Sequence, residues 1–226
     1  MANNISKRGR SESRPTSDRG RSRTAPAGNR SANGDAPERK GPRPLISVFG
    51  SSRTHEGEEL YSDSLWMGRL LGQNGFDVVT GGYSGVMEAV SRGAHEVGAH
   101  VKGVTMRPFG ETTNTYIIEE ITTRDFYARL RRLVDQVDGY VVMQGGMGTL
   151  AELTFTWQKL WLKMLPERPC VLVGRRWQRV LDCWLENLIV DPADYSCMTV
   201  ADNPEQACAI LRAHFSGKDV NAAVEK

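Results

Sequence analysis

From residue 44 onward, short apolar runs alternate with amphipathic stretches. The runs are rich in β-branched residues, which is typical of buried strands, and we expect strands at residues 45–50, 76–80, 100–105, 117–122, 139–144, 169–174 and 197–202. The stretches between them have helical apolar spacing, and we expect helices at residues 58–74, 84–98, 124–136, 149–165, 176–189 and 203–215. Asp-Asn-Pro at 202–204 is a plausible cap, with proline in the first turn of the last helix. The alternation predicts an α/β protein with a parallel sheet and helices on both faces.

Residues 1–43 differ from the rest of the chain in composition. They carry 11 Lys and Arg against 4 Asp and Glu, a net charge of +7, whereas the remainder carries 18 against 23, a net charge of −5. The segment has too few large apolar side chains to offset the entropy lost on ordering. We therefore expect a disordered basic tail at 1–43, a folded domain at 44–218 and a flexible C-terminus at 219–226. The tail would either contact nucleic acid or an acidic partner weakly, or only aid solubility.

The chain of 226 residues, 39% of them hydrophobic, is long enough for one sizeable core. No apolar run is long enough to span a bilayer, and the start has no apolar signal region, so we expect a cytoplasmic protein with no membrane partner. The four cysteines lack CxxC spacing and the four histidines lack an HExxH motif. We therefore expect reduced thiols and no metal site.

Three of the predicted strands end in turns of glycines and small hydroxyl residues. These are Gly50, Ser51 and Ser52; Gly81 and Gly82; and Gly145, Gly146, Gly148 and Thr149. The carboxyl ends of parallel strands meet at one edge of a sheet, where amides at helix N-termini bind phosphate groups. Ordinary tight-turn geometry is the alternative interpretation. Neither the Walker A pattern nor GxGxxG followed by an acidic residue is present, which argues against metal-assisted triphosphate chemistry.

Three charged residues each have two interpretations. Thr149 and Glu152 have the spacing of a capping box, but the Glu152 carboxylate could instead point toward a bound sugar. Arg129 lies at the border of the apolar stripe of its helix, where it could extend along the surface or reach across the edge of the sheet. Glu88, near the start of the second helix, could cap that helix or contact the sugar.

Two glycine motifs carry a family resemblance. QGGMGTLAE at 144–152 resembles the PGGxGTxxE signature of the LOG ("lonely guy") family, phosphoribohydrolases formerly misnamed lysine decarboxylases. TGGYSGVMEAVSRGA at 80–94 resembles the first glycine motif of the bacterial branch, and VFGSSR at 48–53 is similar to the opening strand. The resemblance covers roughly residues 45–215.

The resemblance implies a dimeric, Rossmann-like, doubly wound protein that needs no cofactor. It would cleave the N-glycosidic bond of a nucleoside 5′-monophosphate, AMP or an N6-modified adenylate, to free base and ribose 5-phosphate. The catalytic arginine and glutamate of the family fall on Arg129 and Glu152, which we expect to line one cleft. Gln144 replaces the proline of the family and Leu130 replaces the lysine that often follows the arginine, which leaves the preferred base open.

The chemistry of these residues fits such a reaction. Breaking a ribosyl C–N bond develops positive charge on the sugar, which a carboxylate such as Glu152 stabilises while it activates water. An arginine such as Arg129 can hold a phosphate or hydroxyl and orient the substrate. A carrier of a phosphorylated cofactor, such as the molybdenum cofactor, and a nucleic-acid-associated protein that uses the basic tail are the alternatives. The presence of both charged residues favours the enzyme, and no lysine lies in a recognisable pyridoxal phosphate context, which argues against a decarboxylase.

Overall fold

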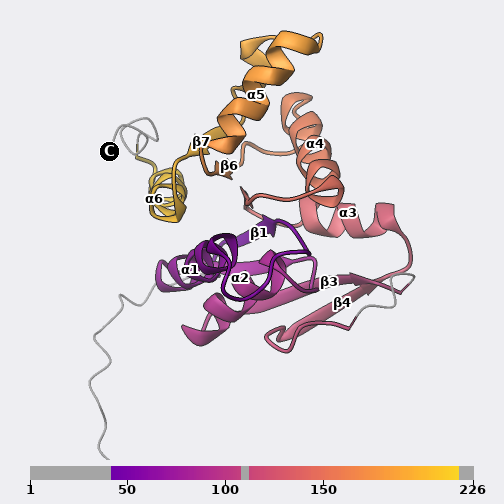
Figure 1. Ribbon diagram of the computed structural model, residues 1–226, viewed down its shortest axis with the longest axis vertical. Helices are drawn as coiled ribbons and strands as arrows, with labels where there is room; N and C mark the ends of the chain where they lie inside the picture. Colours follow the sequence, from indigo (N-terminus) through magenta and orange to yellow (C-terminus); the bar gives the residue numbers. More distant parts are fainter. Residues whose placement is uncertain (1–41, 108–111, 219–226) are drawn as a thin grey trace, which may run out of the picture. The chain divides into compact units, whose positions relative to one another are not determined.

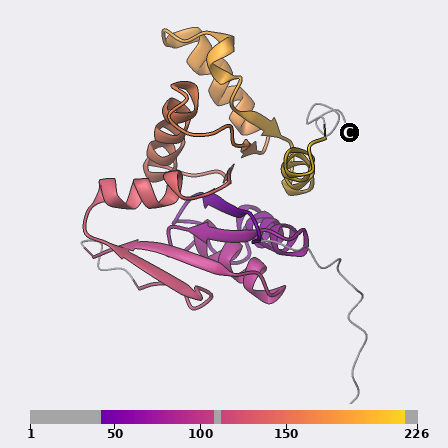
Figure 2. The ribbon, with the colours of Figure 1, turned by 180° about the vertical axis from the view of Figure 1, so that it is seen from behind.

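The fold is built on a parallel sheet, seen in a computed structural model that describes residues 42–107 and 112–218. Within these residues the sheet has seven strands: β1 (Leu45–Phe49), β2 (Asp77–Thr80), β3 (Val101–Met106), β4 (Glu119–Thr123), β5 (Gly139–Val142), β6 (Cys170–Val173) and β7 (Thr199–Ala201). Every neighbouring pair is parallel. At one edge of the sheet, β4 pairs along its whole length with β3, from Lys102 to Met106 (Figure 2).

The order of the strands, β4-β3-β2-β1-β5-β6-β7, reverses between β1 and β5. The chain first builds the sheet outward from β1 to β4, and then returns so that β5 pairs with the other side of β1. The last residues of these two strands, Phe49 and Val142, are partners in the register. The turns that follow β1 and β5 therefore leave the sheet side by side, at the position where doubly wound folds bind ligands.

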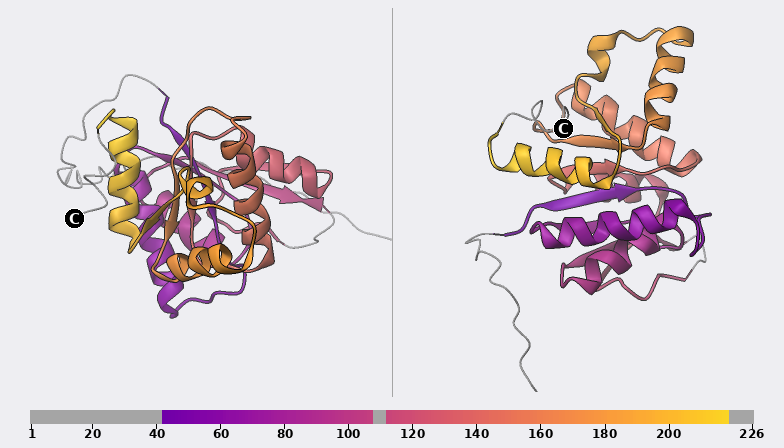
Figure 3. Two further views of the ribbon diagram at one scale, coloured as in Figure 1. Left: turned by 90° about the horizontal axis from the view of Figure 1, so that it is seen from above. Right: turned by 60° about the vertical axis from the view of Figure 1, so that its left-hand side comes forward.

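Helices cover both faces of the sheet. They are α1 (Glu59–Gln73), α2 (Val86–Glu96), α3 (Phe126–Asp135), α4 (Met147–Trp161), α5 (Arg176–Asn187) and α6 (Pro204–Phe215), with a short 3₁₀ helix η2 (Pro192–Tyr195) after α5. One apolar cluster packs α1, α2 and α6 on one face, and a second packs α3, α4 and α5 on the other. Figure 1 labels the helices α1 to α6, and the left view of Figure 3 has α6 and α4 on opposite sides of the strands.

Local signals explain where several helices begin. The Asp125 side chain accepts the Ala128 N–H at 2.7 Å and caps α3, the helix that carries Arg129. The Asn203 side chain caps α6, with Pro204 at its first position, as the sequence predicts. α2 begins after Gly85, whose φ of +71° and closeness to the Ser51 carbonyl leave no room for a side chain.

The predicted parallel α/β architecture is confirmed, with every expected strand and helix present among the described residues. α4 begins at Met147, two residues before the expected start, and ends at Trp161, shortly before Lys163 takes a positive φ of 54°. The predicted flexible C-terminus at 219–226 and all but the last two residues of the predicted tail lie outside the described residues. Arg43, at the border of that tail, donates to the Gly72 carbonyl at 2.7 Å and pairs with Asp77 at 3.2 Å.

Candidate active site

Backbone hydrogen bonds join the turns that follow β1, β2 and β5. The Ser51 N–H donates to the Gln144 carbonyl at 3.0 Å, which ties the β1 turn to the β5 turn. The Val86 N–H donates to the Ser51 carbonyl at 2.8 Å, and the Ser84 hydroxyl donates to the Ser52 carbonyl at 3.1 Å. The three glycine-rich turns that the sequence singles out therefore form one surface at the carboxyl edge of the sheet.

The turn after β5 exposes amide donors. Gly145, Gly146 and Gly148 are all exposed. The first backbone bond within α4 runs from the Leu150 N–H to the Gly146 carbonyl, so the N–H groups of residues 147–149 have no partner inside the helix. These donors and the positive end of the helix dipole make the start of α4 suitable for an anion.

The other small residues of the predicted site differ in exposure. Gly81 and Gly82 are buried, Gly50 and Ser51 are half-buried, and Ser52 is exposed. Thr149 is 2% exposed and packs under Gly145, where a side chain on the glycine would collide with the threonine hydroxyl. Gly145 and Thr149 thus fix the shape of the turn that contains the exposed glycines.

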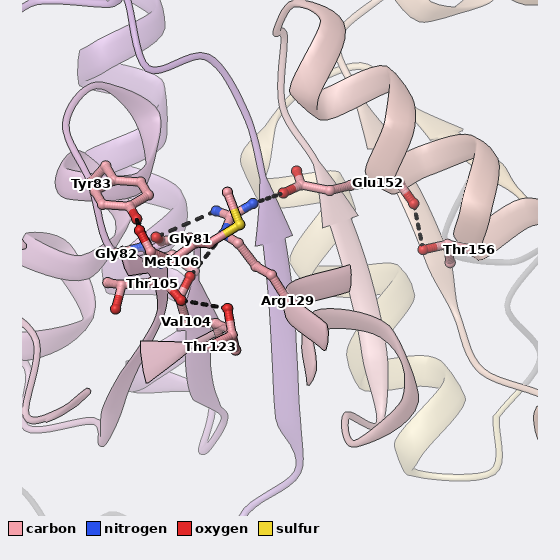
Figure 4. A network of polar contacts seen from close by, with 11 residues as sticks. Gly81, Gly82, Tyr83, Val104, Thr105, Met106, Thr123, Arg129, Glu152 and Thr156 are labelled. Atoms are coloured by element: carbon pink, nitrogen blue, oxygen red, sulfur yellow. Dashed lines mark hydrogen bonds and ion pairs between the residues drawn. The ribbon is translucent and has the colours of Figure 1, made fainter. Parts of the chain in front are cut away.

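Arg129 and Glu152 form a buried ion pair. One terminal nitrogen of the Arg129 guanidinium lies 3.0 Å from Glu152 Oε1, and the two residues are only 6% and 7% exposed. Arg129 Nε donates to the Val104 carbonyl at 2.9 Å, which ties α3 to β3. Its other terminal nitrogen lies 3.4 Å from the Gly81 carbonyl (Figure 4). The guanidinium thus connects α4, β3 and the turn after β2.

Tyr83 also contacts Arg129, although it is not among the predicted site residues. The guanidinium carbon of Arg129 lies 5.7 Å from the centre of the Tyr83 ring, within the range of a cation–π contact. The Tyr83 hydroxyl accepts the Met106 N–H at 2.8 Å, which holds the ring in place. The sequence signal was present, because Tyr83 directly follows the Gly81-Gly82 pair.

The environment of Glu152 makes its carboxylate a stronger base than usual. Burial raises the pKa of Glu152, and the charge and hydrogen bond of Arg129 act in the opposite direction. The capping-box interpretation is wrong, because the N-cap of α4 is Gly146 and receives no side-chain hydrogen bond. Glu152 instead lies in the second turn of α4 and points toward Arg129 (Figure 4).

Glu88 lies in the first turn of α2 and is half-buried. No side chain caps α2 at Gly85, so the capping interpretation of Glu88 is not supported. Its carboxylate raises the pKa of Tyr61 on the neighbouring helix α1, although burial of Tyr61 is the larger cause. Within the described residues, Glu88 forms no hydrogen bond or ion pair with Arg129 or Glu152.

No group of three or more His, Cys, Asp or Glu side chains in the part of the chain that the structure describes is placed to hold a metal ion. None of the helices in residues 42–107 and 112–218 combines the length and the apolar character that a membrane span requires.

Together, the reversal of strand order and the joined glycine-rich turns define a doubly wound α/β protein with a buried arginine–glutamate pair near the carboxyl edge of its sheet. The model of the family described as "Possible lysine decarboxylase" matches residues 87–211. The chain belongs to this family, the LOG family. Lys102 and Lys159 are held in ion pairs with Glu119 and Asp135, which is an ordinary structural role.

Curated relatives carry the phosphoribohydrolase name. The chain is 28% identical over 171 residues to a probable cytokinin riboside 5′-monophosphate phosphoribohydrolase, LOG4, of Oryza sativa subsp. japonica, across 73% of this chain and 74% of the relative. It is 33% identical over 135 residues to LOG7 of Arabidopsis thaliana, named as a cytokinin riboside 5′-monophosphate phosphoribohydrolase, across 57% of this chain and 62% of the relative. The match to the Arabidopsis protein thus spans less than two thirds of its length.

Solved structures of similar fold include two proteins whose names refer to the molybdenum cofactor. The molybdenum cofactor binding protein of Rippkaea orientalis matches with a TM-score of 0.61 at 21% identity, over 77% of this chain and 98% of that one. The molybdenum cofactor carrier protein of Chlamydomonas reinhardtii matches with a TM-score of 0.59 at 21% identity, over 77% of this chain and 99% of that one. At this identity the likeness concerns the fold alone.

Proposed function

We propose that this protein is a nucleoside 5′-monophosphate phosphoribohydrolase that acts on AMP or an N6-modified adenylate. The reaction adds water across the N-glycosidic bond, so that hydroxide joins C1′ of the ribose and the base leaves with a proton. The products are the free base and ribose 5-phosphate. The relatives named as phosphoribohydrolases support this proposal at the level of the family.

The observation that carries the proposal is the buried Arg129–Glu152 pair on helices next to the exposed glycine turn at the start of α4. A carrier needs the turn to hold a phosphorylated ligand, but gains nothing from a desolvated carboxylate next to the sugar. A buried ion pair is also a weak source of stability, because the desolvation of both charges offsets much of their attraction. Such a pair at the ligand-binding edge of a doubly wound sheet is better explained by chemistry than by folding.

Glu152 takes the part of the catalytic carboxylate. Positive charge develops on the ribose as the C–N bond lengthens, and a negative group close to C1′ stabilises that state. The raised pKa of Glu152 makes the carboxylate a better acceptor for a proton of the attacking water. Because Glu152 is 7% exposed, bulk water competes little with these interactions.

Arg129 positions both the carboxylate and the substrate. Its bonds to the Val104 and Gly81 carbonyls fix the guanidinium plane, so that it can hold Glu152 in one orientation. The guanidinium keeps its charge throughout the reaction, and it can donate to a ribose hydroxyl or to the departing base. The amides at Gly145, Gly146 and Gly148 would bind the 5′-phosphate from the start of α4.

Base release from a panel of nucleoside monophosphates, followed by chromatography, tests the proposal. We expect wild-type protein to release base, and Glu152→Gln to lower kcat by about 10²- to 10⁴-fold. Glu186→Gln is the matched control, because Glu186 is an exposed residue near the end of α5 and belongs to none of the predicted turns. Wild-type protein that binds a nucleotide, seen as a rise in melting temperature, but releases no base would refute the proposal and favour a carrier.

We also propose that the protein is a homodimer. Several large apolar side chains of α3 and α4 and of the loop after α4 are exposed, among them Tyr127 at 73%, Trp161 at 53% and Met164 at 64%. Exposed groups of this kind are typical of protein interfaces. Light scattering coupled to size exclusion should give twice the chain mass, and Trp161→Ser with Met164→Ser should shift the protein toward the monomer. A wild-type monomer throughout the micromolar range would contradict this proposal.

A further inference from the structure

A groove of about 540 Å³ lies between the turn after β5 and helix α5. Its polar lining comes from Ser51, Gln144, Gly145, Gly146 and Arg176, and the side chains of α5 supply most of an apolar wall. Ser51, Gly145 and Gly146 belong to the turns that we propose bind the phosphate, and Gln144 directly precedes one of these turns. Arg176 is different, because it begins the helix that follows β6 and belongs to no glycine motif.

Arg176 is the one charged residue among those that line this groove. It is the first residue of α5, it is exposed, and it makes no ion pair within the described parts of the chain. One terminal nitrogen of its guanidinium lies 3.5 Å from Gln144 Oε1, a long hydrogen bond. The adjacent Arg175 differs, because it pairs with Asp202 at 2.9 Å.

A phosphate monoester carries close to two negative charges at neutral pH. The amides at the start of α4 offer the equivalent of about half a positive charge, which leaves most of the phosphate charge unmatched. A guanidinium supplies a full charge and two parallel donors that fit phosphate oxygens. Arg176 shares one groove with these amides, so it is placed to complete the site.

Two neighbours of Arg176 support an anion in this groove. Gln144 stands where the family signature has proline, and its side-chain oxygen gives the guanidinium an acceptor that proline lacks. Trp177 lines the groove and is 5% exposed, and its indole N–H has no acceptor among the described residues. An unpaired buried donor of this kind is costly, so a polar partner is missing at this wall of the groove.

We propose that Arg176 binds the 5′-phosphate of the substrate and that Gln144 positions the guanidinium. Arg176 would then determine the preference for phosphorylated over unphosphorylated ligands. This inference rests on the proposed function for its substrate, but binding of a phosphorylated sugar tests it separately.

The experiment compares Arg176→Ala with Arg175→Ala, which removes the same charge from the next residue. For Arg176→Ala we expect the KM for AMP to rise by about 10-fold, the size expected for one hydrogen bond to a charged group, with kcat unchanged. Binding of ribose 5-phosphate to the otherwise unaltered protein, measured by calorimetry, should weaken by a similar factor. Arg175→Ala should change neither quantity.

Gln144→Ala tests the positioning role. We expect its KM to rise by roughly 3-fold, less than in Arg176→Ala, because the guanidinium is kept but less well placed. In the Arg176→Ala background the same substitution should have no further effect on KM, since its only proposed action is through Arg176. A purely structural role for Gln144 would instead add to the Arg176→Ala effect and lower the melting temperature.

The outcomes separate this inference from the proposed function. Equal KM values for Arg176→Ala and Arg175→Ala, or a loss confined to kcat, would overturn the role of Arg176. If the wild-type protein releases base from no nucleotide, the proposed function fails. The affinity for ribose 5-phosphate then still decides whether Arg176 binds phosphate, and equal affinity in wild-type protein and Arg176→Ala would overturn it.

Discussion

Replacement of Arg129 by methionine tests whether the ion pair is buried and charged in the folded protein. Methionine keeps much of the volume of the side chain but removes the cation and all of its donors. The carbonyls of Val104 and Gly81 lose their partners, and Glu152 is left at 7% exposure without a counter-charge. Breaking a buried pair in this way costs about 3–5 kcal/mol of unfolding free energy. For a domain of this size that corresponds to a fall in melting temperature of about 10 °C.

The loss should depend on pH, with a sign that follows from Glu152. Burial raises the pKa of Glu152, and Arg129 counteracts part of that rise, so Arg129→Met should raise the pKa further. Some carboxyl groups have a higher pKa in the folded protein than in the unfolded chain. The contribution of such a group to stability is greatest below its unfolded-state pKa, and it is lost as the pH rises through its folded-state pKa. The deficit of Arg129→Met relative to wild type should therefore be larger at about pH 8 than at about pH 5.

Urea unfolding followed by tryptophan fluorescence measures this deficit at both pH values. The double variant Arg129→Met with Glu152→Gln no longer has a titrating carboxyl, so its deficit should vary less with pH. At about pH 8 it should also be more stable than Arg129→Met alone, since a neutral amide costs less to bury than a charge. A deficit below about 1 kcal/mol, or one that is the same at both pH values, would refute our account of the pair.

Three further predictions concern the same region. Gly81→Ala should lower stability by about 1–3 kcal/mol in thermal denaturation, because the new methyl group would collide with the guanidinium of Arg129. Gly148→Ala is the control and should leave stability unchanged, because its methyl group would meet open space. Asp125→Ala removes the cap of α3 and should cost about 1 kcal/mol in urea unfolding, and a loss below the error of the measurement would contradict that role. The kcat/KM for AMP should fall as the pH drops through a midpoint above the usual glutamate value of about 4.3, and a profile flat down to that value would exclude Glu152 as the base.

Much of the fold could be predicted from local patterns. The apolar runs gave each strand to within a few residues, and the cap at Asn203 followed from its neighbours in the chain. The start of α4 was misplaced, because Thr149 and Glu152 have the spacing of a capping box while the chain already turns into the helix at Met147. Tertiary contacts decided that case, since Glu152 gains a buried cation as its partner and Thr149 fills the space under Gly145. A cytoplasmic location and a disordered basic tail stay predictions.

The sequence by itself determined the elements of this protein and the kinds of turn between them, because strand and helix periods, caps and glycines act over a few neighbouring residues. It also indicated that Arg129 lies at the border of an apolar stripe, but not which groups the guanidinium contacts. Only the tertiary structure decided that, because pairing of β5 with β1 brings α4 beside α3 and joins groups that are 23 residues apart. The position of Arg176 beside the turn after β5 was decided in the same way, since β6 pairs with β5 and so brings the start of α5 to that edge.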